Sequence, residues 1–121
     1  MHRVLIVSDE RFLQRLVGFA LTGLDAEVHY AEGADEAERR CRRTLFDLIL
    51  VLEVAQFLSG RNLIGRVRPA GLRRPAVYVL TWQQAEQTVL SLLECGVDQY
   101  LTFPVSLARL RSKVAEELGR T

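Results

Sequence analysis

Five short apolar runs alternate along this chain with five segments whose apolar residues recur at helical spacing. The run Val4 to Val7 is too short for a helix and is apolar on both faces, which is typical of a central parallel strand. Strict alternation of buried strands and helices favours an α/β domain with a parallel sheet covered on both faces. We therefore predict strands at Val4–Val7, Glu27–Ala31, Leu48–Leu52, Ala76–Thr81 and Asp98–Thr102.

The segments between these runs have the periodicity of amphipathic helices. From Glu10 onward the apolar positions follow the i, i+3, i+4, i+7 pattern; they are Leu13, Leu16, Val17, Ala20, Leu21 and Leu24. Asp35 can cap or start the second helix. Pro69 ends the third helix and Gly96 the fourth, and Ser106 is the expected N-cap of the last. We interpret the arginines at positions 39–43 as a solvated face, because the same helix carries acidic residues.

The composition fits one domain, residues 1–121, and excludes several functions. The net charge of +1 gives no reason to expect nucleic acid or an acidic membrane surface as a partner. His2 and His29 are isolated, and the two cysteines have no metal-ligand spacing, so we expect no metal site and reduced thiols in a cytoplasmic protein. The start of the chain is too weakly apolar for a signal peptide or a membrane span.

In open parallel sheets, sites form at the carboxyl ends of strands, so four places deserve inspection. They are Ser8 to Glu10, Leu52 to Val54, Thr81 with Trp82, and Thr102 to Pro104. The corresponding stretches read "VLIVSDE", "DLILVLEVAQFLSG", "VLTWQQ" and "GVDQYLTFPVS". In this order and spacing they resemble the receiver domain of two-component response regulators. The resemblance covers the whole chain and implies a flavodoxin-like (CheY-like), doubly wound sheet of five parallel strands, order 2-1-3-4-5, with five helices.

The resemblance also implies a set of reactive groups. In receiver domains a carboxylate ending the third strand accepts a phosphoryl group, and two carboxylates after the first strand help it to hold Mg²⁺. A lysine before a proline and a hydroxyl ending the fourth strand contact the phosphoryl oxygens. In this sequence Leu52 stands at the acceptor position, Phe103 at the lysine position and Ser8 at the first acidic position, whereas Asp9, Thr81 and Pro104 match the family.

These substitutions are consistent with one another. Removing the acceptor alone would leave a buried lysine without its partner. Here the acceptor and lysine positions both carry apolar residues, and replacing a buried ion pair by packed apolar groups is often neutral or stabilising. We expect Leu52 and Phe103, with Trp82 as a further candidate, to fill a dry remnant of the pocket that binds Mg²⁺ weakly or not at all; the alternative is that Trp82 and Phe103 line an open pocket. Glu53 as acceptor would require a register shift that turns the strand over.

The retained residues also have structural interpretations. Asp9 can cap the first helix with Glu10 in its first turn, Thr81 can bond nearby backbone, and Pro104 can keep a cis bond that shapes a loop. Tyr100 occupies the family's aromatic switch position, but it is equally well explained as a packed strand aromatic.

The expected function is that of a pseudo-receiver, which is not an enzyme, needs no cofactor and binds signalling partners without phosphorylation. The family's fourth helix, fifth strand and fifth helix supply the expected interaction surface, and a homodimer can form there; its residues here are Glu94, Gln99, Tyr100, Arg109 and Lys113. Arg109 replaces a residue that is often acidic in dimeric DNA-binding members, which argues against their particular dimer. The alternatives are a small-molecule sensor that uses the vacated apolar pocket, and phosphorylation at Glu53 or Ser8.

Overall fold

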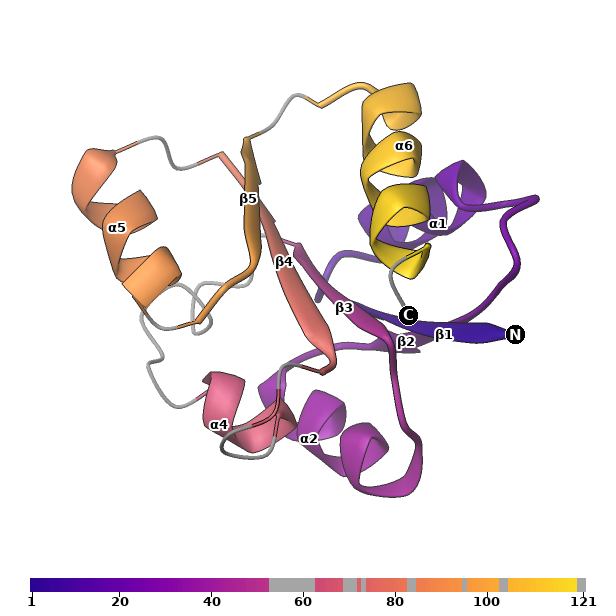
Figure 1. Ribbon diagram of the computed structural model, residues 1–121, viewed down its shortest axis with the longest axis horizontal. Helices are drawn as coiled ribbons and strands as arrows, with labels where there is room; N and C mark the ends of the chain where they lie inside the picture. The colour runs from indigo at the N-terminus through magenta and orange to yellow at the C-terminus, as the bar shows by residue number, and fades with distance from the viewer. Residues whose placement is uncertain are drawn as a thin grey trace.

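A computed structural model describes residues 1–52, 63–68, 72, 74–82, 85–94, 96–102 and 105–119. Strands and helices alternate along the chain as the apolar pattern predicts (Figure 1). The strands are β1 (His2–Val7), β2 (Ala26–Ala31), β3 (Leu48–Leu52), β4 (Ala76–Thr81) and β5 (Gln99–Thr102). The helices are α1 (Arg11–Ala20), α2 (Ala34–Arg43), α4 (Leu63–Val67), α5 (Glu86–Glu94) and α6 (Leu107–Leu118).

The five strands form one parallel sheet in the order β2-β1-β3-β4-β5, which confirms the predicted order 2-1-3-4-5. Val7 pairs with Val51 between β1 and β3, and Thr81 pairs with Thr102 between β4 and β5. Because the strands are parallel, their carboxyl ends lie at one edge of the sheet. The described parts of the four stretches selected from the sequence therefore lie at that edge; they are Ser8 to Glu10, Leu52, Thr81 with Trp82, and Thr102.

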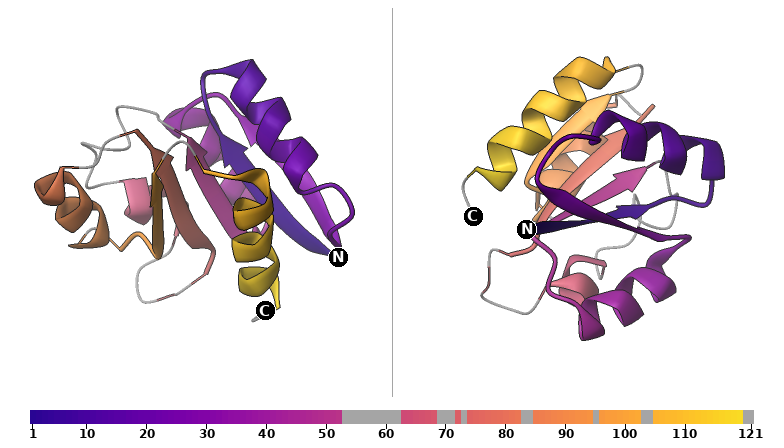
Figure 2. Two further views of the ribbon diagram at one scale, coloured as in Figure 1. Left: turned by 90° about the horizontal axis from the view of Figure 1, so that it is seen from above. Right: turned by 90° about the vertical axis from the view of Figure 1, so that its right-hand side faces the viewer.

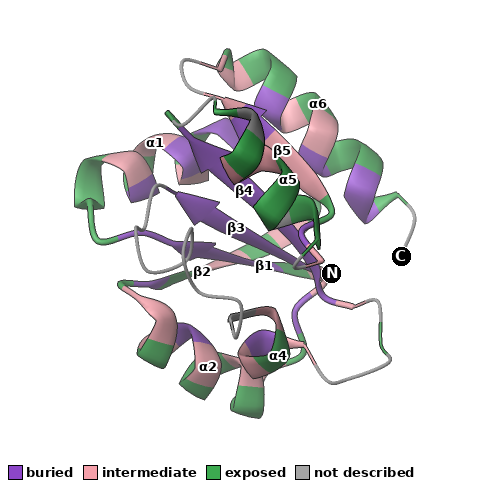
Figure 3. Ribbon diagram, turned by 90° about the vertical axis from the view of Figure 1, so that its left-hand side faces the viewer, coloured by how far each residue is buried: buried purple, intermediate pink, exposed green. Residues whose placement is uncertain are grey.

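The core has two halves, one on each face of the sheet (Figure 2). Val17 of α1 and Leu110 of α6 pack with the strand residues of one face, and Ala37 of α2 and Val67 of α4 pack with those of the other. β3 is buried along its whole length (Figure 3). Coverage on both faces explains why that strand is continuously apolar rather than alternating.

Helix ends show where local sequence signals succeed and fail. Ser106 caps α6 as predicted, since its hydroxyl accepts from the Arg109 amide at 3.0 Å. The expectation for α1 is wrong: its cap is Glu10, not Asp9, and the Glu10 carboxylate accepts from the Phe12 amide at 2.8 Å. The N-cap of α2 is Gly33, and Asp35 lies in the first turn. A negative charge in the first turn interacts favourably with the helix dipole.

Two aspartates stabilise the edge of the sheet where the strands begin. Asp47, just before β3, accepts from the Arg3 amide at 2.9 Å and donates its own amide to the Arg3 carbonyl. Asp98, just before β5, makes the same reciprocal pair with Val77 at 2.8 Å in both directions. We call Asp47 and Asp98 the aspartate clamps. Each joins a strand to its neighbour before the regular ladder begins.

Arg68 reinforces the second clamp. Its side chain is 9% exposed and donates to the Asp98 carboxylate at 3.0 Å, to the Gly96 carbonyl at 2.6 Å and to the Pro75 carbonyl at 3.3 Å. Gly96 has a φ of 100°, which agrees with its predicted role in stopping the preceding helix. The guanidinium thus links the end of α4 to the starts of β4 and β5.

A buried polar pair lies under α6. The Tyr78 hydroxyl, on β4, donates to Glu117 at 2.7 Å, and both side chains are almost inaccessible to solvent. Arg74 approaches the other oxygen of Glu117 at 3.8 Å. This pair fixes the carboxyl-terminal turn of α6 against the sheet.

Candidate functional site

Leu52 occupies the centre of the candidate site, at the end of β3. It is 0% exposed, it pairs with Leu80 of β4, and it belongs to the half of the core that α1 and α6 cover. A leucine offers neither a nucleophile nor a metal ligand. The side chain at this position therefore contributes packing, and its surroundings are those of a hydrophobic core.

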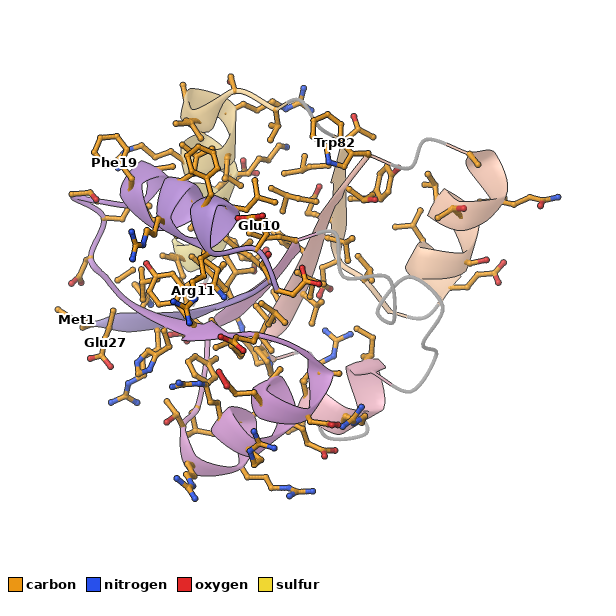
Figure 4. The ribbon with its side chains drawn as sticks, turned by 180° about the vertical axis from the view of Figure 1, so that it is seen from behind. Met1, Glu10, Arg11, Phe19, Glu27 and Trp82 are labelled. Carbon is orange, nitrogen blue, oxygen red and sulfur yellow. The ribbon has the colours of Figure 1, made fainter. Side chains whose placement is uncertain are left out.

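The turn from β1 into α1 is held by its own side chains. The Ser8 hydroxyl is fully buried and accepts from the Glu10 amide at 3.0 Å. Asp9, between them, is exposed, so the retained carboxylate points its charge to solvent rather than into a buried pocket. Figure 4 shows Glu10 at the amino-terminal end of α1, beside this turn.

Gln14, on α1, contacts this turn, and the sequence pattern did not reveal that role. Its amide is buried and donates to the Ser8 carbonyl at 2.6 Å and to the Ala31 carbonyl at 3.3 Å. It thereby joins the carboxyl ends of β1 and β2. The available signal was a polar residue between Leu13 and Val17 on the apolar side of the helix.

Thr81 and Trp82 follow one another but differ sharply in environment. Thr81 is fully buried at the end of β4. The Trp82 side chain is 58% exposed and lies beside the start of α6 (Figure 4). Of the two roles left open for Trp82, filling a dry pocket does not hold, because more than half of its surface is exposed to solvent. Trp82 lines an apolar pocket between α1 and α6 instead.

Four positions of the selected strand ends lie outside the described residues: Glu53, Val54, Phe103 and Pro104. Pro69, the predicted end of the third helix, lies outside them as well. The predicted cis bond before Pro104 falls there too. Among the described residues, a cis bond precedes Pro75.

The described part of the chain contains no cluster of three or more histidine, cysteine or acidic residues that could hold a metal ion. The shifted pKa values lie elsewhere. Arg66 hydrogen-bonds Asp35 between α4 and α2; this lowers the pKa of the Asp35 carboxyl and raises the pKa of Arg66. Burial raises the pKa of the Cys41 thiol to about 11.

Comparison with known proteins places this geometry in a family. The response regulator receiver domain family matches residues 4–115. The chain is a receiver domain. It superposes on a response regulator from Thermotoga maritima with a TM-score of 0.86, 25% identity and 98% coverage of both chains.

Two curated relatives of this receiver domain are transcriptional regulators. It is 30% identical over 120 residues to the virulence transcriptional regulatory protein PhoP of Salmonella typhimurium, covering 99% of this chain and 53% of that protein. It is 29% identical over 118 residues to the transcriptional regulatory protein DltR of Streptococcus agalactiae, covering 94% and 52%. The chain thus spans about half the length of these relatives.

The expected interaction surface of the receiver domain is formed by α5, β5 and α6, the helices that the family counts as fourth and fifth. Glu94 on α5 and Arg109 on α6 are exposed, and Gln99, Tyr100 and Lys113 are half-buried. Tyr100 packs against the half of the core covered by α2 and α4. This contact fits a packed strand aromatic at the edge of the sheet. Among the described residues, no helix is long and apolar enough to cross a membrane.

Proposed function

We propose that this receiver domain is not phosphorylated at the usual position and acts as a phosphorylation-independent interaction module in two-component-type signalling. The observation that carries the proposal is Leu52, which stands at the acceptor position with no exposed surface. Phosphoryl transfer to the family's acceptor requires a carboxylate nucleophile at this place, and leucine has no atom that can replace it.

The β1–α1 turn supports the same conclusion for the metal. Mg²⁺ prefers several hard oxygen ligands, including carboxylates. Ser8 replaces one carboxylate, and its hydroxyl already bonds the backbone of Glu10. Asp9 is then the one acidic residue left from the family's set. We therefore propose that Mg²⁺ binds weakly or not at all and that the domain has no catalytic activity of its own.

The surface of α5, β5 and α6 is the proposed contact for a signalling protein or a second copy. Glu94 and Arg109 are exposed charges of opposite sign on the helices that precede and follow β5, the strand that carries the half-buried Tyr100. With a net charge of +1, the domain has no broad electrostatic attraction for nucleic acid or membranes. We propose that it acts in the cytoplasm through protein contacts.

The phosphorylation part is tested with acetyl phosphate and Mg²⁺, with intact-protein mass spectrometry as the readout. The wild type is expected to stay unmodified. The matched variant combines Ser8→Asp, Leu52→Asp and Phe103→Lys, which restores the family's groups. Phosphorylation of the triple variant alone would support the proposal, whereas stoichiometric acyl phosphate on the wild type would overturn it. If neither protein reacts, the loops differ from the family beyond these three side chains.

The interaction part is tested by affinity capture with Tyr100→Ala. Tyr30→Ala is the matched control, because Tyr30 lies on β2, at the opposite edge of the sheet. We expect partners to be lost with Tyr100→Ala and retained with Tyr30→Ala. If both variants capture the same partners in equal amounts, Tyr100 is not part of the interaction surface.

Two alternatives have less support. A ligand in the place of the phosphoryl group would need space beside Leu52, whose side chain is completely enclosed. Phosphorylation of Ser8 would need an accessible hydroxyl, but that group is buried and bonded to the following turn. Glu53 lies outside the described residues.

A further inference from the structure

An apolar pocket of about 210 Å³ lies between α1, α6 and the end of β4. Among the described residues, every side chain that lines it is apolar; Leu13 and Leu16 come from α1, Leu107 from α6, and Leu80 and Trp82 from the end of β4. Leu52 is not among the described lining residues, although Leu80, its neighbour on β4, is. It opens on the face of the sheet opposite to the core that Tyr100 joins.

The exposed indole of Trp82 forms part of the pocket wall. An indole left 58% exposed at the mouth of an apolar cavity keeps a large hydrophobic surface in water. A ligand that covers this surface would remove it from water, and this burial would favour binding. Trp82 is also the single tryptophan of the chain, which makes its fluorescence a direct reporter of the pocket.

We propose that this pocket binds a small, uncharged aromatic molecule of one or two rings. A dry cavity of about 150 Å³ is enough for benzene, and drug-sized ligands need at least about 300 Å³, so the volume selects a guest between these sizes. A charged guest would lose its hydration without finding a polar partner in the lining. An aromatic ring can also stack on the indole or meet its edge.

A protein is the competing occupant, because Phe12 and Phe19 are also exposed on α1. The neighbouring helix argues against it. The exposed residues of α6 are polar or small; they are Ala108, Arg109, Ser112, Ala115 and Glu116. The apolar surface therefore does not continue across α6, and what lies between the helices is a hollow. Concave apolar sites enclosed on several sides suit small ligands.

The test is a titration of the methyl-labelled protein followed by NMR, with Trp82 fluorescence as a second readout. The probes are 2-naphthol, uncharged at neutral pH, and 2-naphthoate, its anionic counterpart of similar size. We expect saturable shifts for 2-naphthol confined to the methyls that line the pocket, which include those of Leu13, Leu16, Leu80 and Leu107. Binding of 2-naphthoate is expected to be weaker by about tenfold or more.

Leu16→Lys places a charge at the pocket and is expected to weaken 2-naphthol binding by about tenfold or more. Leu90→Lys, the same change on α5, is the matched control and should leave binding unchanged. Trp82→Ala, with folding checked by circular dichroism, should also weaken binding. The proposal is overturned if the wild type gives no saturable shifts, if Leu16→Lys binds as the wild type does, or if 2-naphthoate binds equally well. A dimer seen by sedimentation that Leu16→Lys dissociates would instead assign the face to a second copy.

Discussion

Replacing Leu52 by aspartate alone should destabilise the domain severely at neutral pH and less in mild acid. The leucine is completely buried at the end of β3. Losing its packing costs about 3 kcal/mol, within the range for large-to-small core changes. A carboxylate buried without a partner has its pKa raised, and a rise of about three units adds about 4 kcal/mol at pH 7. The sum of about 7 kcal/mol is comparable to the whole stability of a typical domain.

The pH dependence has a definite sign. A carboxyl whose pKa is raised in the folded state binds more protons folded than unfolded, so stability falls as pH rises from the unfolded pKa of about 3.9. Between pH 7 and pH 5 the Leu52→Asp variant should therefore regain about 2.5 kcal/mol relative to wild type. Leu52→Asn introduces a side chain of the same shape as aspartate but without its charge, so this variant should show no such gain.

The assay is urea denaturation followed by circular dichroism at pH 5, 6 and 7 for the wild type and both variants. If Leu52→Asp and Leu52→Asn unfold at the same urea concentration at pH 7, the carboxylate is solvated. That result would refute the description of this position as closed core and would revive an open acceptor pocket.

Three further predictions concern groups remote from Leu52. Arg68→Met should lower the free energy of unfolding by about 2–4 kcal/mol, because it removes the charge that pairs with the Asp98 carboxylate and the donor to the Gly96 carbonyl; urea denaturation measures the loss. Tyr78→Phe should cost about 1–3 kcal/mol by removing the buried donor to Glu117, and adding Glu117→Leu should cost less than the sum of the two single changes. The Cys41 pKa of about 11 leaves about one thiolate in a thousand at pH 8, so alkylation of this residue, followed by peptide mass spectrometry, should be slow when folded and fast in urea.

The sequence predicts the sheet well where burial alone decides the pattern. Every residue of β3 and β4 is buried, and the predicted bounds Leu48–Leu52 and Ala76–Thr81 are those of the structure. The start of β1 was missed because His2 and Arg3 are polar, although both pair with β2. Hydrophobic periodicity carries no signal for polar residues at the start of a strand.

The site was predicted less completely, because its details depend on contacts between distant segments. The buried role of Gln14 requires the carbonyl of Ala31, which a helical pattern cannot supply. The position of Trp82 depends on where α6 begins relative to β4. The alternation of side chains along β4 therefore could not show that the indole lies in the pocket between α1 and α6. The aspartate clamps were missed for the same reason.

The aspartate clamps have a consequence for how this domain could evolve. Asp47, Asp98 and Arg68 act where the strands begin, whereas Leu52 and Thr81 lie where they end. These polar restraints on the fold are thus one strand length away from the carboxyl ends of the strands. A substitution at the carboxyl ends that keeps the core apolar leaves all three residues and their hydrogen bonds in place. The chemistry of one edge of the sheet and the polar anchoring of the other can therefore change independently, provided that no unpaired charge is buried.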